Sequence, residues 1–261
     1  MQEIGMTNLT TTSCSMIISR TDNLTRLNMP NLKNFYLLNP SQPRLSINIV
    51  SSETFCITIG EVTNFVKSEA VLMGEIQGDY CGVTDSDRLL FQEKLCEIKN
   101  FSLIDFDPTC QVVVGTVLIG PGDEEHVSKL KSVKWIFGRL IIRKTNLTAI
   151  DFLDSLEYVV VLIEFYRPIQ IIENLQLQNI IFPKLKMARP DIYSMFNIHD
   201  NNKKLMSDPS ICHGIRNGLN TTKQYIPRID DKTCEDIEAQ SGGASQISVL
   251  LGILILVIVL H

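Results

Sequence analysis

The sequence predicts a mainly β protein with short helices, in which short strands stack on one another as a leucine-rich-like solenoid. Two observations predict this class. A segment near the N-terminus recurs in the middle of the chain, and short apolar strands recur through the second half. A unit of some 20–50 residues with one apolar side cannot bury that side alone, so successive units must stack.

The long-range repeat relates residues 14–33, CSMIISRTDNLTRLNMPNLK, to residues 167–186, RPIQIIENLQLQNIIFPKLK, without a gap at an offset of 153. Apolar residues coincide along the alignment, and both copies end in Pro-x-Leu-Lys. Further on, two cysteines of the first copy have counterparts in the second. We therefore expect two homologous units, with the C-terminal part of each present in the chain.

The short period lies inside the second unit. One isoleucine marks each strand, at spacings of 23, 29 and 27 residues: Ile119, Ile142, Ile171 and Ile198. The segments 115–119 (GTVLI) and 138–142 (GRLII) share a glycine followed by alternating apolar positions. A polar residue follows three positions after each later strand: Thr145, Asn174 and Asn201. Such a side chain can bond the backbone at a corner, so a strand and its corner predict one rung.

Two segments connect these strands. Residues 127–137, VSKLKSVKWIF, predict a short helix that leads into the next strand. Residues 152–166, FLDSLEYVVVLIEFY, are apolar enough for a rung edge that faces the core. Trp135 is the only tryptophan, and we expect it to pack at the end of the core in preference to forming a ligand platform.

Cysteines and N-x-[ST] sequons together indicate an oxidising, secretory compartment. The seven cysteines show no CxxC motif and no zinc-like spacing with histidine: Cys14, Cys56, Cys81, Cys96, Cys110, Cys212 and Cys234. The five sequons predict N-glycosylation: Asn8, Asn23, Asn100, Asn146 and Asn220. A cytosolic protein with buried thiols is the alternative. No signal peptide is visible in the first residues, MQEIGMTNLTTTSC.

The C-terminal segment 247–261 is almost entirely apolar and follows the small residues 241–243. This pattern predicts a signal for attachment of a glycosylphosphatidylinositol (GPI) lipid, with Ser241 as the attachment residue. The polar spacer at 244–246 is shorter than usual for such a signal. Counted from Ala244, the apolar run reaches the lower limit for a membrane span. A membrane-spanning tail and a buried terminal helix are therefore the alternatives.

Charge and motifs exclude several functions. The net charge of −5 leaves no basic patch to neutralise phosphates, so no nucleic-acid partner is expected. No G-x-S-x-G, H-E-x-x-H, Walker or G-x-G-x-x-G motif is present, so we expect no catalytic residue and no cofactor. The acidic turn at 120–126, GPGDEEH, suggests one divalent-ion hypothesis: Asp123, Glu124, Glu125 and His126. A solvated turn is the preferred interpretation, and we expect no metal site.

The combined pattern resembles the receptor L domain of insulin- and EGF-type receptors. Four segments carry the resemblance: 110–119 (CQVVVGTVLI), 136–156 (IFGRLIIRKTNLTAIDFLDSL), 169–177 (IQIIENLQL) and 182–185 (FPKL). The pattern FCIT…YC at Cys56 and Cys81, echoed at Cys212 and Cys234, is similar to that of the nematode-expanded, kinase-lacking L-domain proteins.

The resemblance implies a short right-handed β-helix with parallel sheets and disulfide-capped ends. It also implies which cysteines pair: Cys96 with Cys110 at the N-terminal cap, and Cys56 with Cys81 and Cys212 with Cys234 at the two C-terminal ends. Cys14 is then left unpaired. The sequence alone leaves this connectivity open, because six cysteines permit fifteen pairings.

We expect five segments along the chain. They are the C-terminal part of a first receptor L domain (1–81), a linker (82–95), a complete receptor L domain (96–234), a second linker (235–246) and the hydrophobic C-terminal segment (247–261). Only 13 residues precede the repeat in the first unit. This favours a truncated N-terminus, with a degenerate half-domain packed on the intact one as the alternative.

The expected function is that of a non-catalytic module on the extracellular side of the cell surface, held at the membrane by its C-terminal anchor. The resemblance implies insulin-like or growth-factor-like peptide ligands, bound as a decoy or co-receptor. The outward residues of 116–118, 139–143 and 168–172 would form the recognition face, with no contact assigned because no aromatic cluster marks it. A GPI-anchored structural or adhesive protein is the alternative, although 235–246 lacks a Ser/Thr-rich stalk. A third possibility is a truncated chain without function.

Overall fold

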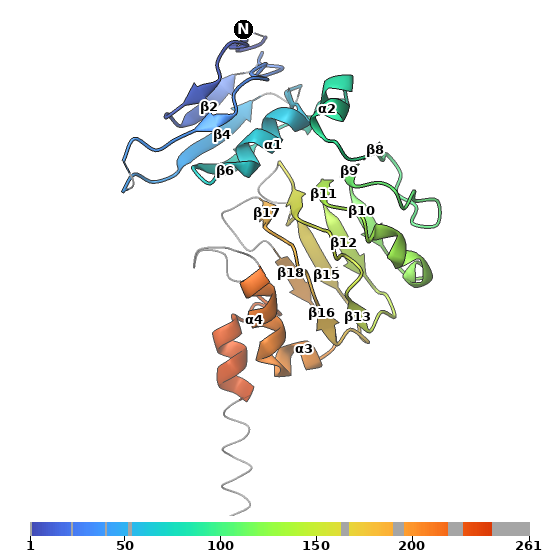
Figure 1. Ribbon diagram of the computed structural model, residues 1–261. Helices are drawn as coiled ribbons and strands as arrows, with labels where there is room; N and C mark the ends of the chain where they lie inside the picture. Colours follow the sequence, from blue (N-terminus) through green and yellow to red (C-terminus); the bar gives the residue numbers. More distant parts are fainter. Residues whose placement is uncertain are drawn as a thin grey trace, which may run out of the picture.

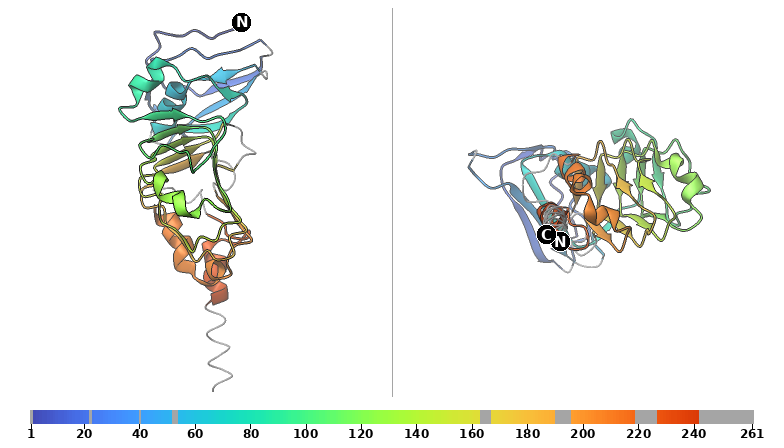
Figure 2. Two further views of the ribbon diagram at one scale, coloured as in Figure 1. Left: turned by 90° about the vertical axis from the view of Figure 1, so that its right-hand side faces the viewer. Right: turned by 90° about the horizontal axis from the view of Figure 1, so that it is seen from below.

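The computed structural model describes residues 2–21, 23–39, 41–51, 54–162, 167–189, 196–218 and 227–241, and it is mainly β with short helices (Figure 1). An N-terminal unit, residues 2–81, lies at one end of the molecule. A C-terminal unit, residues 95–241, follows it and carries its helices at the opposite end (Figure 2).

Three parallel sheets form the C-terminal unit. The first has the order β17-β14-β11-β9-β8: β17 (Met187–Arg189), β14 (Tyr158–Val160), β11 (Trp135–Phe137), β9 (Val112–Val114) and β8 (Leu95–Glu97). The second has four strands: β10 (Val117–Ile119), β12 (Leu140–Arg143), β15 (Ile169–Ile172) and β18 (Phe196–His199). The third pairs β13 (Ala149–Ile150) with β16 (Asn179–Ile180).

The four isoleucines that mark the predicted strands are neighbours in the second sheet. Ile119 pairs with Ile142, Ile142 with Ile171, and Ile171 with Ile198, all in parallel register. All four side chains are fully buried in the core of the C-terminal unit. The strands that the short period predicts are therefore present and are paired in sequence order.

The three inner strands of the first sheet, β9, β11 and β14, contribute buried side chains to both faces, which explains why they are continuous apolar runs. Val113, Ile136 and Val159 point into the core of the C-terminal unit. The alternate positions pack against the core of the N-terminal unit: Val112, Val114, Trp135, Phe137 and Val160. Trp135 is thus buried between the two units. Residues 163–166 of the segment expected to face the core lie outside the described residues.

Parallel pairs also form the N-terminal unit. Its three-stranded sheet has the order β2-β4-β6: β2 (Met16–Thr21), β4 (Leu45–Ser51) and β6 (Val71–Ile76). Two shorter pairs accompany it: β1 (Thr11–Thr12) with β3 (Asn34–Phe35), and β5 (Cys56–Ile57) with β7 (Asp79–Tyr80). Helix α1 (Ile59–Lys67) begins with a capping box between Thr58 and Glu61. Helix α2 (Asp85–Leu90) lies in the expected linker 82–95 and begins with the same motif.

The two repeated segments share their local structure as well as their sequence. Four pairs of residues at the offset of 153 are buried in both copies: Leu24 and Leu177, Leu27 and Ile180, Met29 and Phe182, Leu32 and Leu185. The turn hydrogen bonds also repeat. Leu32 N donates to Met29 O at 3.2 Å, and Leu185 N donates to Phe182 O at 3.5 Å. The proline of each copy therefore lies in the same kind of turn.

The remaining elements lie at the side and end of the C-terminal unit. The sequence predicts that the segment 127–137 forms a short helix that leads into a strand. A 3-10 helix, η1 (Glu124–Leu130), includes the first four residues of this segment, and the last three residues of the segment form β11. Helices α3 (Lys204–Ser207) and α4 (Pro209–Gly218) follow the last strand. A final helical segment at 234–241 includes the start of the expected linker 235–246.

Three disulfides join Cys56 to Cys81, Cys96 to Cys110, and Cys212 to Cys234. These are the pairs that the family resemblance implies. The first joins β5 to the end of β7, the second joins β8 to the residues before β9, and the third joins α4 to the segment 234–241. Cys14 is a free, exposed thiol.

Candidate functional site

The outer face of the four-stranded sheet brings together the three segments predicted to form a recognition face. One residue of each strand lies in the same row, in register with its neighbours, and has a half-buried side chain that faces outward. These four residues are Leu118, Ile141, Gln170 and Asn197. The next row along the strands contains Arg143, Ile172 and His199. The first row thus places two apolar side chains beside two amide side chains, and the second row places Ile172 between Arg143 and His199. Such a mixed surface is suited to contact with a protein or a peptide.

A ladder of buried polar side chains holds the corners at the C-terminal edge of this sheet. Asn174 is fully buried. Its Oδ1 accepts hydrogen bonds from N and Oγ1 of Thr145 at 3.0 and 2.7 Å. Its Nδ2 donates to Ile142 O at 3.0 Å and to Asn201 Oδ1 at 3.0 Å. The predicted corner residues therefore contact one another and fix the spacing between successive strands of this sheet.

The residue before each corner side chain adopts a left-handed backbone conformation. Lys144, Glu173 and Asp200 have φ angles of 56°, 58° and 55°. This conformation turns the chain sharply, so that the next polar side chain points inward. The outer face is consequently carried on a rigid frame, because each strand ends in the same turn and each turn is bonded to the next.

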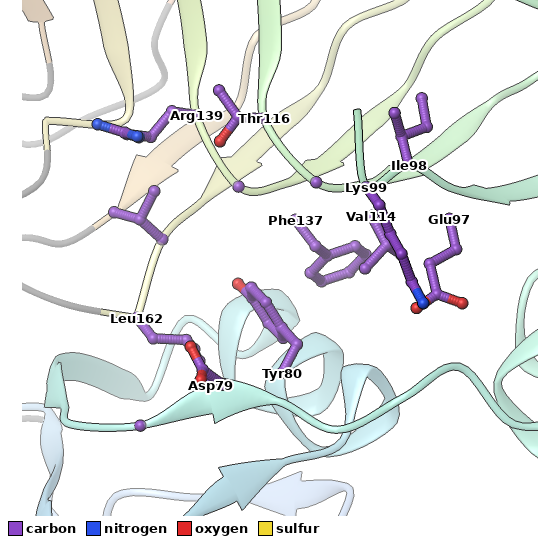
Figure 3. Close-up of a pocket in the computed structure, with 14 residues that line it drawn as sticks. Asp79, Tyr80, Glu97, Ile98, Lys99, Val114, Thr116, Phe137, Arg139 and Leu162 are labelled. Atoms are coloured by element: carbon purple, nitrogen blue, oxygen red, sulfur yellow. The ribbon is translucent and has the colours of Figure 1, made fainter. Parts of the chain in front are cut away.

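A pocket of about 360 Å³ lies at the opposite, N-terminal edge of the same sheet (Figure 3). The N-terminal unit supplies one wall through residues 78–80. The C-terminal unit supplies the rest through residues 97–99, 114–116, 137–139 and 161–162. These segments are mainly the bends where the chain passes from the first sheet to the second. The pocket is therefore a feature of the junction between the two units.

Glycines form the bends above the pocket. Gly115 and Gly138 have φ angles of 137° and 149°. A Cβ atom on Gly138 would lie 2.2 Å from Gly115 O, and one on Gly115 would lie 2.4 Å from Ile98 O. The bends stack so closely that no side chain fits between them. The glycine shared by GTVLI and GRLII is thus required by this stacking.

Two aromatic rings from different units form the floor of the pocket. The rings of Tyr80 and Phe137 meet edge to face, with centroids 5.6 Å apart. Tyr80 Oη donates a hydrogen bond to Val160 O at 2.8 Å, and burial raises the pKa of this phenol. Ile76 N also donates to Leu162 O at 2.9 Å. These two hydrogen bonds fasten the N-terminal unit to the bend at 160–162.

A cluster of rings continues from the floor along the first sheet. Trp135 stacks on Phe137 with a centroid distance of 5.5 Å and on Tyr158 at 3.8 Å. Phe91 packs edge to face against both Trp135 and Phe137 at 5.9 Å. Lys67 Nζ lies 5.4 Å from the Trp135 ring. This cluster lies at the unit junction and not on the outer face, where the sequence shows no aromatic cluster.

Charged side chains of both signs surround the mouth of the pocket. Asp79 lies beside Leu162, and Glu97 and Lys99 lie on the other side of the rings (Figure 3). Arg139 and Thr116 lie at the edge that continues into the outer face of the second sheet. Sequence reasoning missed this pocket. Only its glycines carried a signal, because residues 78–80 and 97–99 belong to no repeat that the sequence shows.

The acidic turn at 120–126 uses its carboxylates as acceptors for its own backbone. Asp123 Oδ2 accepts from Gly120 N at 2.8 Å. Glu124 accepts from Gly122 N at 2.7 Å and from Asn146 N at 2.9 Å. Burial alone would raise the pKa of Glu124, but these backbone donors lower it. Among the described residues, no three His, Cys, Asp or Glu side chains gather as metal ligands would.

The predicted modification sites fall into two groups. Four sequon asparagines have exposed side chains: Asn8, Asn23, Asn100 and Asn146. Asn220 and the hydrophobic segment 247–261 lie outside the described residues. Ser241 is the last described residue of the final helical segment and is half-buried. The described part of the chain contains no helix with the length and apolar character needed to cross a membrane.

Comparison with known proteins gives one match. Residues 109–215 match the family model of the receptor L domain. This range covers the second sheet, the third sheet and the corner ladder, together with most of the first sheet. No curated protein and no solved structure matches the chain significantly.

Proposed function

Because residues 109–215 form a receptor L domain, we propose that this protein is a non-catalytic, extracellular binding module for a peptide or protein ligand. The domain family is one of ligand-binding modules on receptors. The observation that carries the proposal is the outer face of the second sheet. Its half-buried row, Leu118, Ile141, Gln170 and Asn197, offers adjacent apolar and amide side chains on a rigid frame.

We propose that the three sheets are the walls of a right-handed β-helix. The support is the order in which the chain visits them. Strands β11, β12 and β13 lie in the first, second and third sheets, and β14, β15 and β16 repeat that order. Each pair of successive strands in a sheet is parallel. One turn of a coil through three sheets accounts for both observations.

The ligand class that we propose is an insulin-like or growth-factor-like peptide, with this protein acting as a decoy or co-receptor. The family resemblance supports this class. The test is a binding screen of the glycosylated, disulfide-bonded protein against purified insulin-like peptides. We expect Ile141→Asp to weaken binding at least about tenfold, because it places a charge in the centre of the face. Ile104→Asp is the matched control, since Ile104 is 59% exposed and belongs to none of the strands of this sheet.

The result that counts against a peptide receptor is an absence of binding to every such peptide at micromolar concentration. Equal weakening by Ile141→Asp and Ile104→Asp would instead remove the outer face from the proposal. Correct folding of each variant is checked by its far-UV circular dichroism and by its three disulfides, mapped without reduction.

We propose that the N-terminal unit is a second copy of the C-terminal part of the same domain type. The shared burial and turn bonds at the offset of 153 support the two copies. The proposed division of the chain is residues 1–81, 82–95, 96–234, 235–246 and 247–261. The exposed sequon asparagines are proposed glycan carriers. A glycosidase-induced mass shift that disappears in Asn146→Gln would assign one glycan, and an unchanged shift would exclude that position.

We propose a GPI anchor at Ser241, with extracellular, membrane-bound localisation. Its support is the run of small residues before an apolar segment. Phosphatidylinositol-specific phospholipase should release the protein from intact cells, and Ser241→Leu should reduce its surface level. Retention after phospholipase treatment would favour a membrane-spanning tail.

The second candidate function is a GPI-anchored structural or adhesive surface protein without a peptide ligand. The extended outer face also suits a protein surface on another cell. Cell aggregation that depends on the protein and persists in Ile141→Asp would favour this function over the peptide receptor.

A further inference from the structure

We propose that the pocket between the two units is a second contact point, which takes one aromatic or branched aliphatic side chain of an extended peptide. This inference rests on the proposed binding function and deepens it by assigning part of the ligand's chemistry. Thr116 and Arg139 line the pocket and directly precede β10 and β12. A peptide that runs along these strands on the outer face would therefore meet the pocket at their N-terminal ends.

The size of the pocket limits what it can hold. Its volume of about 360 Å³ is near the lower end of the range for ligand sites, roughly 300–1,000 Å³. One large side chain with its flanking backbone fits such a volume, whereas a helix or a folded loop does not. The glycine bends supply a wall without side chains, so backbone of the ligand can approach them closely.

Apolar side chains supply part of the pocket's lining, beside polar side chains and backbone groups. Val114, Val161 and Leu162 are buried and line it beside Phe137. The Tyr80 ring, which meets Phe137 edge to face, is only half-buried and offers a surface on which a ligand ring can pack in a similar geometry. A buried apolar anchor in a pocket at the edge of a flatter surface is the arrangement found at binding hot spots.

The charges at the mouth favour a peptide over an ion. Asp79 and Glu97 are acidic, whereas Lys99 and Arg139 are basic, so neither an anion nor a cation meets a complementary field. Within the part of the chain that the structure describes, the side chains of Asp79, Glu97 and Lys99 have no hydrogen bond or ion pair. They are available to the amide groups and the mixed charges of a peptide that enters between them.

The single tryptophan provides a direct readout. Trp135 stacks on Phe137, which lines the pocket, so occupation of the pocket should change its fluorescence. The full-length protein is titrated with N-acetyl amides of phenylalanine, leucine and alanine, none of which absorbs or emits like tryptophan. We expect saturable changes at roughly millimolar concentration for the phenylalanine and leucine amides and none for the alanine amide.

A variant that fills the pocket tests the location. Thr116→Phe should weaken binding of the phenylalanine amide at least about tenfold, because the new ring occupies the same space. Gln178→Phe is the matched control, since Gln178 lines a different cavity near α4. Chemical-shift changes of the Gly115 and Gly138 amides in the unmodified protein give a second measurement, independent of the variant's folding.

Three outcomes would overturn the inference: no saturable response, an equal response to the alanine amide, or a response that Thr116→Phe leaves unchanged. None of these outcomes contradicts the proposed function of the outer face, because the amide titration probes the pocket alone. Conversely, failure of the insulin-like peptide screen with a positive amide titration would reject the ligand class and keep the pocket.

Discussion

At the scale of single residues, Asn174 links three rungs through one side chain. Its amide is fully buried and both of its ends are used, with Thr145 as donor on one side and Ile142 O and Asn201 as acceptors on the other. A buried amide stabilises the fold when all of its hydrogen bonds are formed. When the amide is removed, its former partners stay buried without hydrogen bonds, and this costs free energy. The corner residues are therefore sensitive positions in the frame of the recognition face.

Asn174→Ala should lower the free energy of unfolding by about 2–4 kcal/mol, because it leaves several buried donors and acceptors without partners. Asn202→Ala is the control. Asn202 follows the next corner, but both of its side-chain bonds are exposed: Nδ2 donates to Leu175 O at 2.9 Å, and Oδ1 accepts from Lys204 N at 2.9 Å. We expect about 1 kcal/mol or less for this variant. Urea denaturation followed by tryptophan fluorescence measures both, and equal effects would contradict the role of the ladder.

Tyr80 makes the attachment of the N-terminal unit sensitive to alkaline pH. Burial raises the pKa of its phenol above the ordinary value of 10.0, so the folded protein keeps this proton more tightly than the unfolded chain. The contribution of Tyr80 to stability is therefore complete below pH 10 and falls as the pH rises beyond it. Tyr80→Phe should be less stable at pH 8, because it loses the bond to Val160 O, but its stability should fall less between pH 8 and pH 11.

Urea midpoints at these pH values test the phenol's contribution. Tyr36→Phe is the control, because the Tyr36 side chain is 49% exposed. If the urea midpoints of the native protein and of Tyr80→Phe fall equally between pH 8 and pH 11, the phenol of Tyr80 does not govern the loss of stability at alkaline pH.

At the scale of elements, the glycine bends between the first and second sheets decide how closely each bend stacks on the previous one. Gly115 N donates to Phe137 O at 2.9 Å, and Gly138 N donates to Val160 O at 2.8 Å. Each bend thus repeats the contact of the previous one and continues the backbone ladder around the corner. The same close stacking leaves the wall of the pocket without side chains.

Gly138→Ala should destabilise the protein by at least about 2 kcal/mol, because a Cβ would clash with Gly115 O and the φ angle of 149° is strained for alanine. Gly214→Ala offers an opposite control. Gly214 lies within α4, and no neighbouring part of the chain comes within 4 Å of the place that a Cβ would take there. Alanine at this position should stabilise by about 0.5–1 kcal/mol. The midpoint temperature of thermal unfolding measures both effects. An equal fall for Gly138→Ala and Gly214→Ala would contradict the view that close stacking of the bends requires glycine at position 138.

The sequence predicts some of these elements and not others, for physical reasons. Strands and corners were predictable, because each rung repeats the same apolar alternation and the same inward polar residue, as at Asn174 and Asn201. The pocket was not predictable, because its floor joins Tyr80 to Phe137 through contacts between units that obey no period. The apolar strand Trp135–Phe137 indicated burial, but not that its second face packs against another unit.

At the scale of the whole molecule, the two apolar cores share one sheet. Val113, Ile136 and Val159 belong to the core of the C-terminal unit, whereas Val112, Phe137 and neighbouring positions belong to that of the N-terminal unit. A thin sheet buried on both faces loses the support of one face when either unit unfolds. The exposed apolar surface would then cost free energy in proportion to its area. We therefore expect the two units to unfold as one cooperative structure.

Phe65→Ala tests this coupling from a position in α1, outside the strands of the shared sheet. Phe65 is 1% exposed in α1 and packs edge to face on Phe35 at 5.7 Å, so its loss should cost about 3–5 kcal/mol. If the units are coupled, hydrogen exchange of the amides in β12 and β15 should accelerate by the same free energy as that in β4. Leu89→Ala, at a side chain that is 84% exposed, should leave both unchanged. Faster exchange confined to β4 would mean that the N-terminal unit opens alone, and the pocket would then lose the wall at residues 78–80 in that open state.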